Sequence, residues 1–311
     1  MFFEGSEKKV EVVVKPQFKG LRQRSKDFWR ELVDNCNATI LSELSNQHCD
    51  SYLLSESSLF VWDDRILMIT CGSTKLIESV EMMVDEFGEA GIASLVYQRK
   101  NEYRSQLQSS SFTDDVERLE RRLDGVGRRF GKVHSHHNLI YSLKKPYQPP
   151  VEDTTTELLM YDFDPSVTEF LTQKAKSKEE IRAFINLESV IEGLEIDDFL
   201  FEPFGYSMNG LRGDDYVTIH ITPQDTSPYI SFETDLGMEE NKSLILNHLL
   251  KVFKPKSFDI ITFNTTNEFD LFDRYVKASA CNEQLECGYT VEFDYYYKSS
   301  LEIEKPFIFL T

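Results

Sequence analysis

The stretch Leu54-Ser55-Glu56-Ser57-Ser58 places small hydroxyls around a carboxylate at the end of a predicted β-strand. A serine hydroxyl can act as a nucleophile, and the motif Gly-x-Ser-x-Gly marks such a serine in many hydrolases. The chain has no such motif, so Ser57 does not resemble a hydrolase nucleophile. Serine is also common in turns, because its hydroxyl bonds to nearby backbone. The residues alone therefore predict a turn before the apolar run 59–61.

Two further side chains have the chemistry to move protons. Cys71 carries a thiol, whose ordinary pKa of about 8.5 suits a general acid, although most free cysteines are small buried hydrophobes. His220 alternates with Thr218 and Thr222, so the three share one face of a predicted strand. A lone histidine on a strand is more often structural, and the residues alone leave both roles open.

A third group, in the segment VHSHHNLI, contains His134, His136 and His137. On a strand, His134 and His136 would lie on one face, but no carboxylate or cysteine stands nearby at the spacing of metal ligands. We therefore predict a solvated edge or loop here. The Gly-x-Gly-x-x-Gly, Walker and His-Glu-x-x-His motifs of nucleotide and zinc sites are absent from the sequence.

The elements that must position these residues recur in both halves of the chain. Hydrophobic periodicity and capping residues predict helices over 25–36, 73–88, 114–123 and 239–253, the second of them closed by Gly88. Strands are predicted over 8–15, 59–71 (a hairpin turning at Asp63-Asp64), 92–100, 153–163, 206–222, 229–235 and 258–263. The segments 101–150 and 164–200 are predicted to be largely loops, and Asn209-Gly210 is a strong hairpin signal.

A strand–turn–strand unit followed by a helix of about four turns appears once in each half, which suggests an internal duplication. Hairpin-linked strands with helices to one side predict antiparallel sheets covered by helices. The expected fold is therefore α+β: a layered α/β/β/α sandwich of two mainly antiparallel sheets flanked by helices.

The composition is that of an ordinary folded protein, with 41% hydrophobic and 28% charged residues in 311. The 53 acidic and 34 basic side chains give a net charge of −19, which disfavours nucleic acid and anionic membranes as partners. Neither a membrane span nor a secretion signal is expected. The five cysteines form no Cys-x-x-Cys pair, which argues against disulfides or structural zinc and favours a reducing cytoplasm.

Six separated segments form a specific pattern: FFEGSEK from residue 2, YLLSESSLFV from 52, ITCGSTKL from 69, FGYSMNGL from 204, YVTIHITP from 216 and YISFET from 229. Together they resemble the eukaryotic-type S-adenosylmethionine decarboxylase family, the pyruvoyl enzymes of polyamine synthesis. Their order and approximate spacing hold from residue 2 to about residue 265. No single segment would suffice, but their joint occurrence in order is specific.

The resemblance implies that the proenzyme cleaves itself at the Glu56–Ser57 bond into chains 1–56 and 57–311. The Ser57 hydroxyl attacks the preceding carbonyl, the amide becomes an ester, and β-elimination leaves a covalent pyruvoyl group on the new N-terminus. This ketone forms a Schiff base with the substrate and acts as the electron sink, in place of pyridoxal phosphate or a metal.

Roles for three further residues follow from the same resemblance. Cys71 matches the proton donor of the decarboxylation, which must deliver its proton to the substrate carbon. Ser207 matches the hydroxyl that assists the acyl shift. His220 matches the base that takes the Cα proton during self-processing.

Other positions match the family's substrate-binding residues. Phe3 and Phe201 correspond to an aromatic pair that sandwiches the adenine and stabilises the sulfonium cation. Glu4 and Glu7 correspond to acidic residues near the active site, and Glu56 supplies the backbone next to the cleaved bond. Where the family often has a glutamate that grips the ribose hydroxyls, this chain has Gln224, which loses the charge-assisted hydrogen bond.

Animal members of the family bind putrescine as an activator at a buried acidic cluster. The matching positions here are Glu11, Asp153, Thr155, Glu157 and Glu233. Buried carboxylates need cationic partners, and a diamine would serve. A lysine of those enzymes is replaced by Ile69, and Val96 and Gln98 replace an aromatic residue and a serine, so activation by putrescine stays an open alternative.

The resemblance thus predicts one catalytic domain over residues 1–311, a monomer or homodimer of short and long chains, that makes the aminopropyl donor for spermidine. A second interpretation keeps the self-processing but changes the substrate to arginine or ornithine. Phe3 and Phe201 argue against it, and Gln224 leaves it open. A third is a non-catalytic paralogue that activates a partner subunit, but such proteins typically lose the serine that stands here at position 57.

Overall fold

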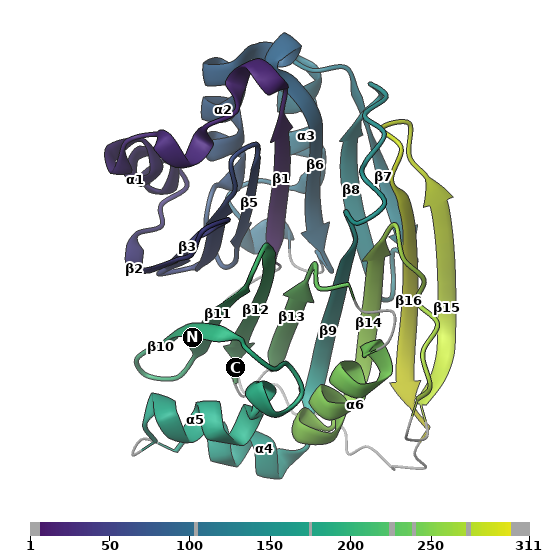
Figure 1. The fold of residues 1–311 in the computed structure, drawn as a ribbon. Coiled ribbons are helices and arrows are strands. Elements are labelled where there is room, and N and C mark those ends of the chain that lie inside the picture. The colour runs from purple at the N-terminus through teal and green to yellow at the C-terminus, as the bar shows by residue number, and fades with distance from the viewer. Residues whose placement is uncertain are drawn as a thin grey trace.

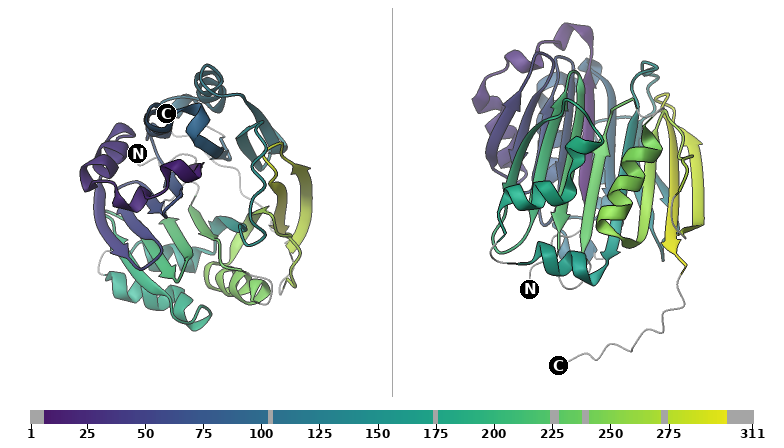
Figure 2. Two further views of the ribbon diagram at one scale, coloured as in Figure 1. Left: turned by 45° about the horizontal axis from the view of Figure 1, so that its top comes forward. Right: turned by 60° about the horizontal axis from the view of Figure 1, so that its bottom comes forward.

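The computed structural model describes residues 7–102, 105–173, 176–223, 228–237, 241–271 and 275–299. They form two eight-stranded antiparallel sheets that face each other, with helices on the two outer sides (Figures 1 and 2). The predicted α/β/β/α sandwich is therefore confirmed.

The first sheet is built from the first half of the chain. Its strand order is β2 (Ile40–Ser45), β3 (Asp50–Leu54), β4 (Ser57–Val61), β5 (Arg65–Thr70), β1 (Lys8–Val14), β6 (Ile92–Lys100), β8 (His137–Leu143) and β7 (Gly125–Gly131). Helices α1 (Lys26–Asn35), α2 (Leu76–Gly91) and α3 (Phe112–Glu120) lie on its outer side (Figure 1).

The second sheet repeats this order with every strand number raised by eight. It runs β10 (Glu195–Leu200), β11 (Tyr206–Arg212), β12 (Asp215–Thr222), β13 (Tyr229–Thr234), β9 (Thr155–Phe163), β14 (Pro255–Phe263), β16 (Thr290–Lys298) and β15 (Tyr275–Gln284). Helices α4 (Pro165–Leu171), α5 (Lys178–Ile185) and α6 (Lys242–Phe253) cover it on the other side. This identical topology confirms the predicted duplication.

Local signals explain where several helices begin. The Ser25 hydroxyl accepts a hydrogen bond from the backbone N–H of Phe28 and caps α1. Ser111 and Ser177 form complete capping boxes before α3 and α5. Short 3-10 helices occupy Pro16–Phe18, Leu21–Gln23, Ser105–Leu107 and Leu187–Ser189.

Four hydrophobic clusters form the core. One packs between the first sheet and its helices, around Trp29 and Tyr97, and another between the second sheet and its helices, around Phe232 and Phe253. Two smaller clusters join the inner faces of the sheets, one around Phe130 and the other around Phe60 and Tyr216. Buried polar and charged side chains also lie on the inner faces, and they include the candidate site.

The predicted loop segments contain elements that the sequence analysis missed. The segment 101–150 contains β7 and β8, and 164–200 contains α4, α5 and β10. Strand β7 was missed because glycines weaken its strand pattern. A Cβ at Gly125 would lie 2.2 Å from the Tyr141 ring, so only glycine fits there. Strands β2, β15 and β16 were also not predicted. The predicted stop at Gly88 is confirmed by its non-helical backbone (φ 65°, ψ 160°), and a short helical stretch beyond this kink takes α2 to Gly91.

The outer helices contribute stability through their buried faces, and α6 allows a matched test. Leu249 is fully buried in the second core, whereas Leu244 on the same helix is 53% exposed. We expect Leu249→Ala to lower the free energy of unfolding by about 2–5 kcal/mol through the cavity it leaves. Leu244→Ala should change it by less than about 0.5 kcal/mol. Equal losses in urea unfolding would contradict this packing.

Candidate active site

Ser57 begins β4 directly after the two-residue turn Ser55-Glu56 that links it to β3. Two hydrogen bonds to Thr39 hold the turn in place. The Ser55 N–H donates to the Thr39 carbonyl at 2.8 Å, and the Ser55 Oγ accepts from the Thr39 N–H at 3.0 Å. Ser57 itself has φ 134°, a conformation that non-glycine residues rarely adopt. Such strain costs on the order of 1–3 kcal/mol and persists only where the surroundings enforce it.

This unusual backbone directs two consecutive hydroxyls at one histidine. Side chains of successive residues in a regular strand point to opposite faces. Here the Oγ atoms of Ser57 and Ser58 both reach Nε2 of His220, at 2.9 and 3.2 Å. The positive φ at Ser57 thus turns its hydroxyl to the inner face of the sheet, beside the bond that precedes it.

His220 lies on β12 of the opposite sheet. Its Nδ1 is 2.9 Å from the Oγ of Ser207, its cross-strand partner on β11, and Thr218 Oγ1 is 2.9 Å from Nε2. Burial, together with the positive charge of Lys100, lowers the pKa of His220 to about 3. The imidazole is therefore neutral near pH 7 and keeps one nitrogen free to accept a proton.

Asn209 completes the polar contacts of this group, and sequence reasoning missed it. Its Oδ1 accepts from the hydroxyls of Ser58 at 2.5 Å and Thr218 at 3.1 Å. The Asn209-Gly210 pair was interpreted as a hairpin signal, which is wrong, since both residues lie inside β11 and the turn follows at 213–214. Glycine is needed at 210 for a different reason: a Cβ there would lie 2.8 Å from Leu194.

Cys71 stands on the other side of the same peptide bond. It follows β5, and its N–H donates to the Glu56 carbonyl at 3.0 Å. Its Sγ lies 3.5 Å from that carbonyl oxygen and 3.9 Å from Oε2 of Glu56. The fold thus brings Glu56, Ser57, Cys71, Ser207 and His220 together from four strand ends.

The substrate-binding candidates are only partly described. Glu7 is buried, with its carboxylate 2.5 Å from Lys100 Nζ and 2.6 Å from the Ser231 hydroxyl, which donates to it. Phe201 follows β10 and is partly buried, and its ring centroid lies 4.8 Å from that of Phe199. Phe3, Glu4 and Gln224 lie outside the described residues.

The candidate diamine residues Glu157 and Glu233 are paired with the chain's own lysines. Lys9 Nζ lies 2.9 Å from Glu157 and 2.6 Å from Glu233, and Lys100 Nζ lies 3.0 and 3.3 Å from the same two side chains. Burial alone would lower the pKa of Lys9, but the two carboxylates raise it overall. Both lysines are therefore held as cations in a layer that excludes water.

The remaining diamine candidates also have partners. Asp153 is 3.3 Å from Arg65 and accepts a hydrogen bond from the Tyr289 hydroxyl at 2.6 Å. The same hydroxyl lies 3.3 Å from Glu11, whose pKa is raised by burial and by the charge of Asp153. Thr155 is buried at the start of β9.

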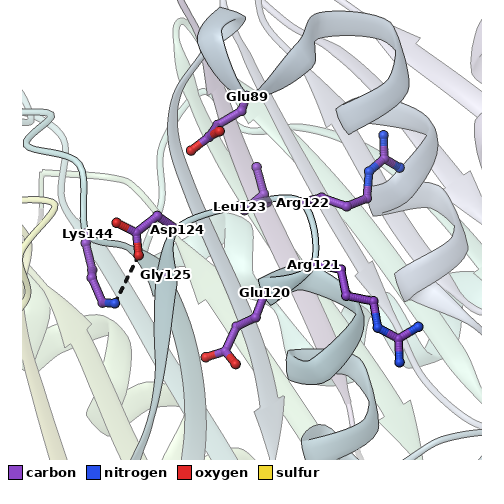
Figure 3. A pocket seen from close by; sticks show the side chains of 8 residues that line it. All are labelled: Glu89, Glu120, Arg121, Arg122, Leu123, Asp124, Gly125 and Lys144. Carbon is purple, nitrogen blue, oxygen red and sulfur yellow. Dashed lines mark hydrogen bonds and ion pairs between the residues drawn. The ribbon is translucent and has the colours of Figure 1, made fainter.

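Two other features lie away from this site. As predicted, His134 is exposed in the loop between β7 and β8. His136 in the same loop is instead largely buried, with Nδ1 2.8 Å from Asp259 and its ring stacked on Tyr295 at 3.9 Å. Figure 3 shows a surface pocket between the end of α3 and the start of β7. Its walls are charged side chains such as Lys144, which bonds to Asp124 at 3.0 Å, and it is not part of the Ser57 site.

Comparison with known proteins assigns this chain to a family. A family model described as adenosylmethionine decarboxylase matches residues 1–304. The chain belongs to the adenosylmethionine decarboxylase family. An S-adenosylmethionine decarboxylase proenzyme from Dictyostelium discoideum is 32% identical over 329 residues, covering 97% of this chain and 86% of that protein. One from Xenopus laevis is 32% identical, covering 94% of this chain and 88% of that protein.

The fold agrees with a solved member of the same family. The crystal structure of a Trypanosoma brucei AdoMetDC-delta26 monomer matches with a TM-score of 0.60 and 23% identity, over 78% of this chain and 99% of that chain. Among the residues described here, none of the helices is both long and apolar enough to cross a membrane.

The low pKa of His220 predicts how stability depends on pH. As the pH falls from 6.5 towards 3, the unfolded chain binds this proton before the folded one does. The free energy of unfolding should fall in this window by up to about 1.4 kcal/mol per pH unit from this group alone. In a Ser57→Ala background, which keeps the chain intact, His220→Asn should flatten the slope measured by urea unfolding.

His48→Asn is the matched control, since this histidine lies about half exposed on the surface. It should leave the slope unchanged. If His220→Asn and its parent lost stability equally steeply below pH 6.5, the imidazole would not be held neutral by the fold.

Proposed function

We propose that this protein is a self-processing S-adenosylmethionine decarboxylase whose Ser57 becomes a covalent pyruvoyl group. The observation that carries the proposal is the strained Ser57, whose hydroxyl lies 2.9 Å from a neutral, buried histidine. The relatives named above are proenzymes of this activity, which supports a chain that matures after synthesis.

Self-processing uses the groups on both sides of the Glu56–Ser57 bond. His220 takes the Ser57 hydroxyl proton as Oγ attacks the Glu56 carbonyl carbon, and Ser207 supports the imidazole through Nδ1. The C–N bond breaks and the nitrogen regains a proton, which leaves an ester. His220 then takes the Ser57 Cα proton, which expels the Glu56 carboxylate, and water replaces the nitrogen, which leaves as ammonia. The short chain ends at Glu56 and the long chain begins with a ketone.

When formed, the pyruvoyl group supplies the electron sink for loss of carbon dioxide. The chain's own residues then control the proton. Cys71 is the proposed donor, since its thiol lies 3.5 Å from the carbonyl next to position 57. The carboxylate of Glu7, fixed by Lys100 and Ser231, borders the site. Phe3 and Phe201 are proposed to hold the adenine, Glu4 to lie beside the substrate, and Gln224 to contact the ribose.

The two chains should remain associated as one domain after cleavage. Strands β1 and β3 belong to residues 1–56 and pair with strands of residues 57–311 in one sheet: β1 with β5 and β6, and β3 with β4. The proposed location is the cytoplasm, where the five cysteines would stay reduced as they are in the structure. The assembly is proposed to be a monomer or a homodimer of the paired chains.

The first test is whether the chain cuts itself. Purified protein should contain a chain ending at Glu56 and a chain from position 57 that is lighter by one ammonia than the serine form and resists N-terminal sequencing. Ser57→Ala should remain a single full-length chain. Ser51→Ala is the matched control, because this buried serine lies in the same hairpin and its hydroxyl has no hydrogen-bond partner among the described residues.

The control should be processed as fast as the natural protein. A single intact chain in fully folded, active material would refute the proposal. Release of labelled carbon dioxide from S-adenosylmethionine, and not from arginine or ornithine, then identifies the substrate.

We further propose that Lys9 and Lys100 supply internally the positive charge that a diamine gives in animal members. They occupy the space between the carboxylates of Glu157 and Glu233, at distances of 2.6–3.3 Å. A buried carboxylate pair with two lysines already in contact has little to gain from a further cation. Putrescine should therefore change neither the processing rate nor the melting temperature of the natural protein.

The variant Lys9→Met tests whether a diamine can replace the ammonium group of Lys9. It leaves buried negative charge uncompensated, which should cost about 3–5 kcal/mol of stability. Putrescine at millimolar concentration should recover part of this loss in thermal unfolding, whereas Lys19→Met, at a half-exposed surface ion pair with Asp64, should not respond. Clear stabilisation of the natural protein by putrescine would contradict the proposal.

A further inference from the structure

Lys8, at the start of β1, is a buried cation with unusual partners. Its side chain is fully buried, and its Nζ donates to the Gly72 carbonyl at 2.8 Å and lies 3.4 Å from the Thr74 hydroxyl. Within the described part of the chain, no carboxylate lies within ion-pair distance of it. A buried ammonium with only neutral partners is costly, and proteins rarely retain one without a use.

Its neighbours show what ordinary pairing looks like here. Arg99, the cross-strand partner of Lys8 on β6, is also buried but lies 2.5 Å from both Asp115 and Glu102. Lys9, the next residue, contacts two carboxylates on the opposite face of the strand. The fold therefore gives Arg99 and Lys9 carboxylate partners, whereas Lys8 has none among the residues that the structure describes.

The segment that Lys8 holds is the turn that carries Cys71. Gly72 in this turn has φ 63°, and the Thr74 hydroxyl donates to the Cys71 carbonyl at 2.8 Å. Lys8 thus binds the residue after Cys71 and the residue that closes the turn. In the sheet it pairs with Thr70, which in turn pairs with Ser57.

The charged and titratable groups that act most strongly on Lys8 are Arg99, Cys71, Asp115 and Glu102, and Lys8 also acts on Cys36. Asp115 and Glu102 are engaged with Arg99. Burial raises the pKa of the Cys36 thiol to about 11, so it stays protonated. On the far side of Cys71, the Glu56 carboxylate lies 3.9 Å from Sγ. Among the described groups that act on Lys8, Cys71 can therefore provide negative charge for it.

We propose that Lys8 is a positioning residue that fixes the Cys71 turn and stabilises the thiolate left when Cys71 gives its proton to the substrate. The inference rests on the proposed role of Cys71 as the donor. In that step the S–H bond breaks, a C–H bond forms at the carbon that has lost carbon dioxide, and the negative charge moves to sulfur. Lys8 transfers no proton; water later returns one to the thiolate.

The effect should depend on pH. Burial and the charge of Arg99 lower the pKa of Lys8 from 10.5 to about 8. Its ammonium is therefore present at neutral pH and is lost as the pH rises through about 8. Stabilisation of the thiolate should fade over the same range.

Variants at Lys8 separate its charge from its hydrogen bonds. Lys8→Gln keeps a donor for the Gly72 carbonyl but removes the charge, and Lys8→Arg keeps both. Each is made in the Ser57→Ala proenzyme, so that the measurement does not depend on self-processing. The alkylation rate of Cys71 by iodoacetamide is followed against pH by mass spectrometry, with Cys281 in the same molecule as the reference thiol.

Lys8→Gln should raise the apparent pKa of Cys71 by about one unit, which makes alkylation at neutral pH about tenfold slower. Lys8→Arg should stay within about twofold of the parent, and Cys281 should not change in either. An unchanged Cys71 profile in a folded Lys8→Gln protein, judged by its circular dichroism and melting temperature, would overturn the inference.

The processed enzyme gives a second readout. Lys8→Gln should lower kcat by about tenfold with KM nearly unchanged, because Lys8 stabilises a charge that forms only in the reaction. A higher KM with unchanged kcat would refute this role. Failure of the chain to process or to decarboxylate would remove the proposed function, yet the alkylation profiles in the Ser57→Ala proenzyme would still report on Lys8.

Discussion

The contact between Ser57 and His220 is the constraint on which the arrangement of this molecule depends. It joins residues 163 positions apart, from the facing strands β4 and β12 of two different sheets. It also requires a backbone conformation at Ser57 that the residue would not adopt alone. Three features keep this contact in place: the hydrogen bonds that hold the turn at Ser55, the packing of the two sheets, and the burial of the imidazole.

The space between the sheets is where the sandwich departs from a simple hydrophobic core. Apolar clusters close this space around Phe60 on one side and Phe130 on the other. Between them lie buried cations and carboxylates in mutual contact, which are costly to desolvate and are retained because they are fully paired. This layer also reaches His220, because burial and the charge of Lys100, which binds Glu7, lower the pKa of that histidine. Charge balance and base strength are therefore linked in one network.

Much of the fold followed from sequence periodicity, and the failures have physical causes. Strands such as β1 and β12 and helices such as α1 carry clear alternation or capping signals, so they were predicted. β7 was missed because glycines are needed where Tyr141 packs, and α4 because a polar cap and Pro165 begin a helix of only seven residues. Asn209 was misinterpreted because a hairpin dipeptide can equally occur inside a strand where a glycine must pack closely.

The candidate site, like the fold, was predicted only in part from the sequence. The family pattern identified Ser57, Cys71 and His220, which the structure brings together. The sequence could not show that Lys9 and Lys100 meet the diamine candidates, because the partners stand more than 100 positions apart in most of these pairs. Nor could it show that Lys8 meets no carboxylate in the described part of the chain, since adjacent residues of β1 point into different layers of the sandwich.

The duplication explains why such a site could form between two sheets. Adding eight to each strand number turns the first sheet into the second, so β4 and β12 are equivalent strands, as are β1 and β9. Equivalent strands of the facing sheets lie opposite each other here, as the contacts of Ser57 with His220 and of Lys9 with Glu157 show. In this chain β4 provides Ser57 and β12 provides His220, the two residues to which we assign the proposed self-cleavage. The same relation places Lys9 of β1 against Glu157 of β9. A single sheet with one exposed face could not exclude water from both sides of Ser57, so the second copy supplies the enclosure as well as the histidine.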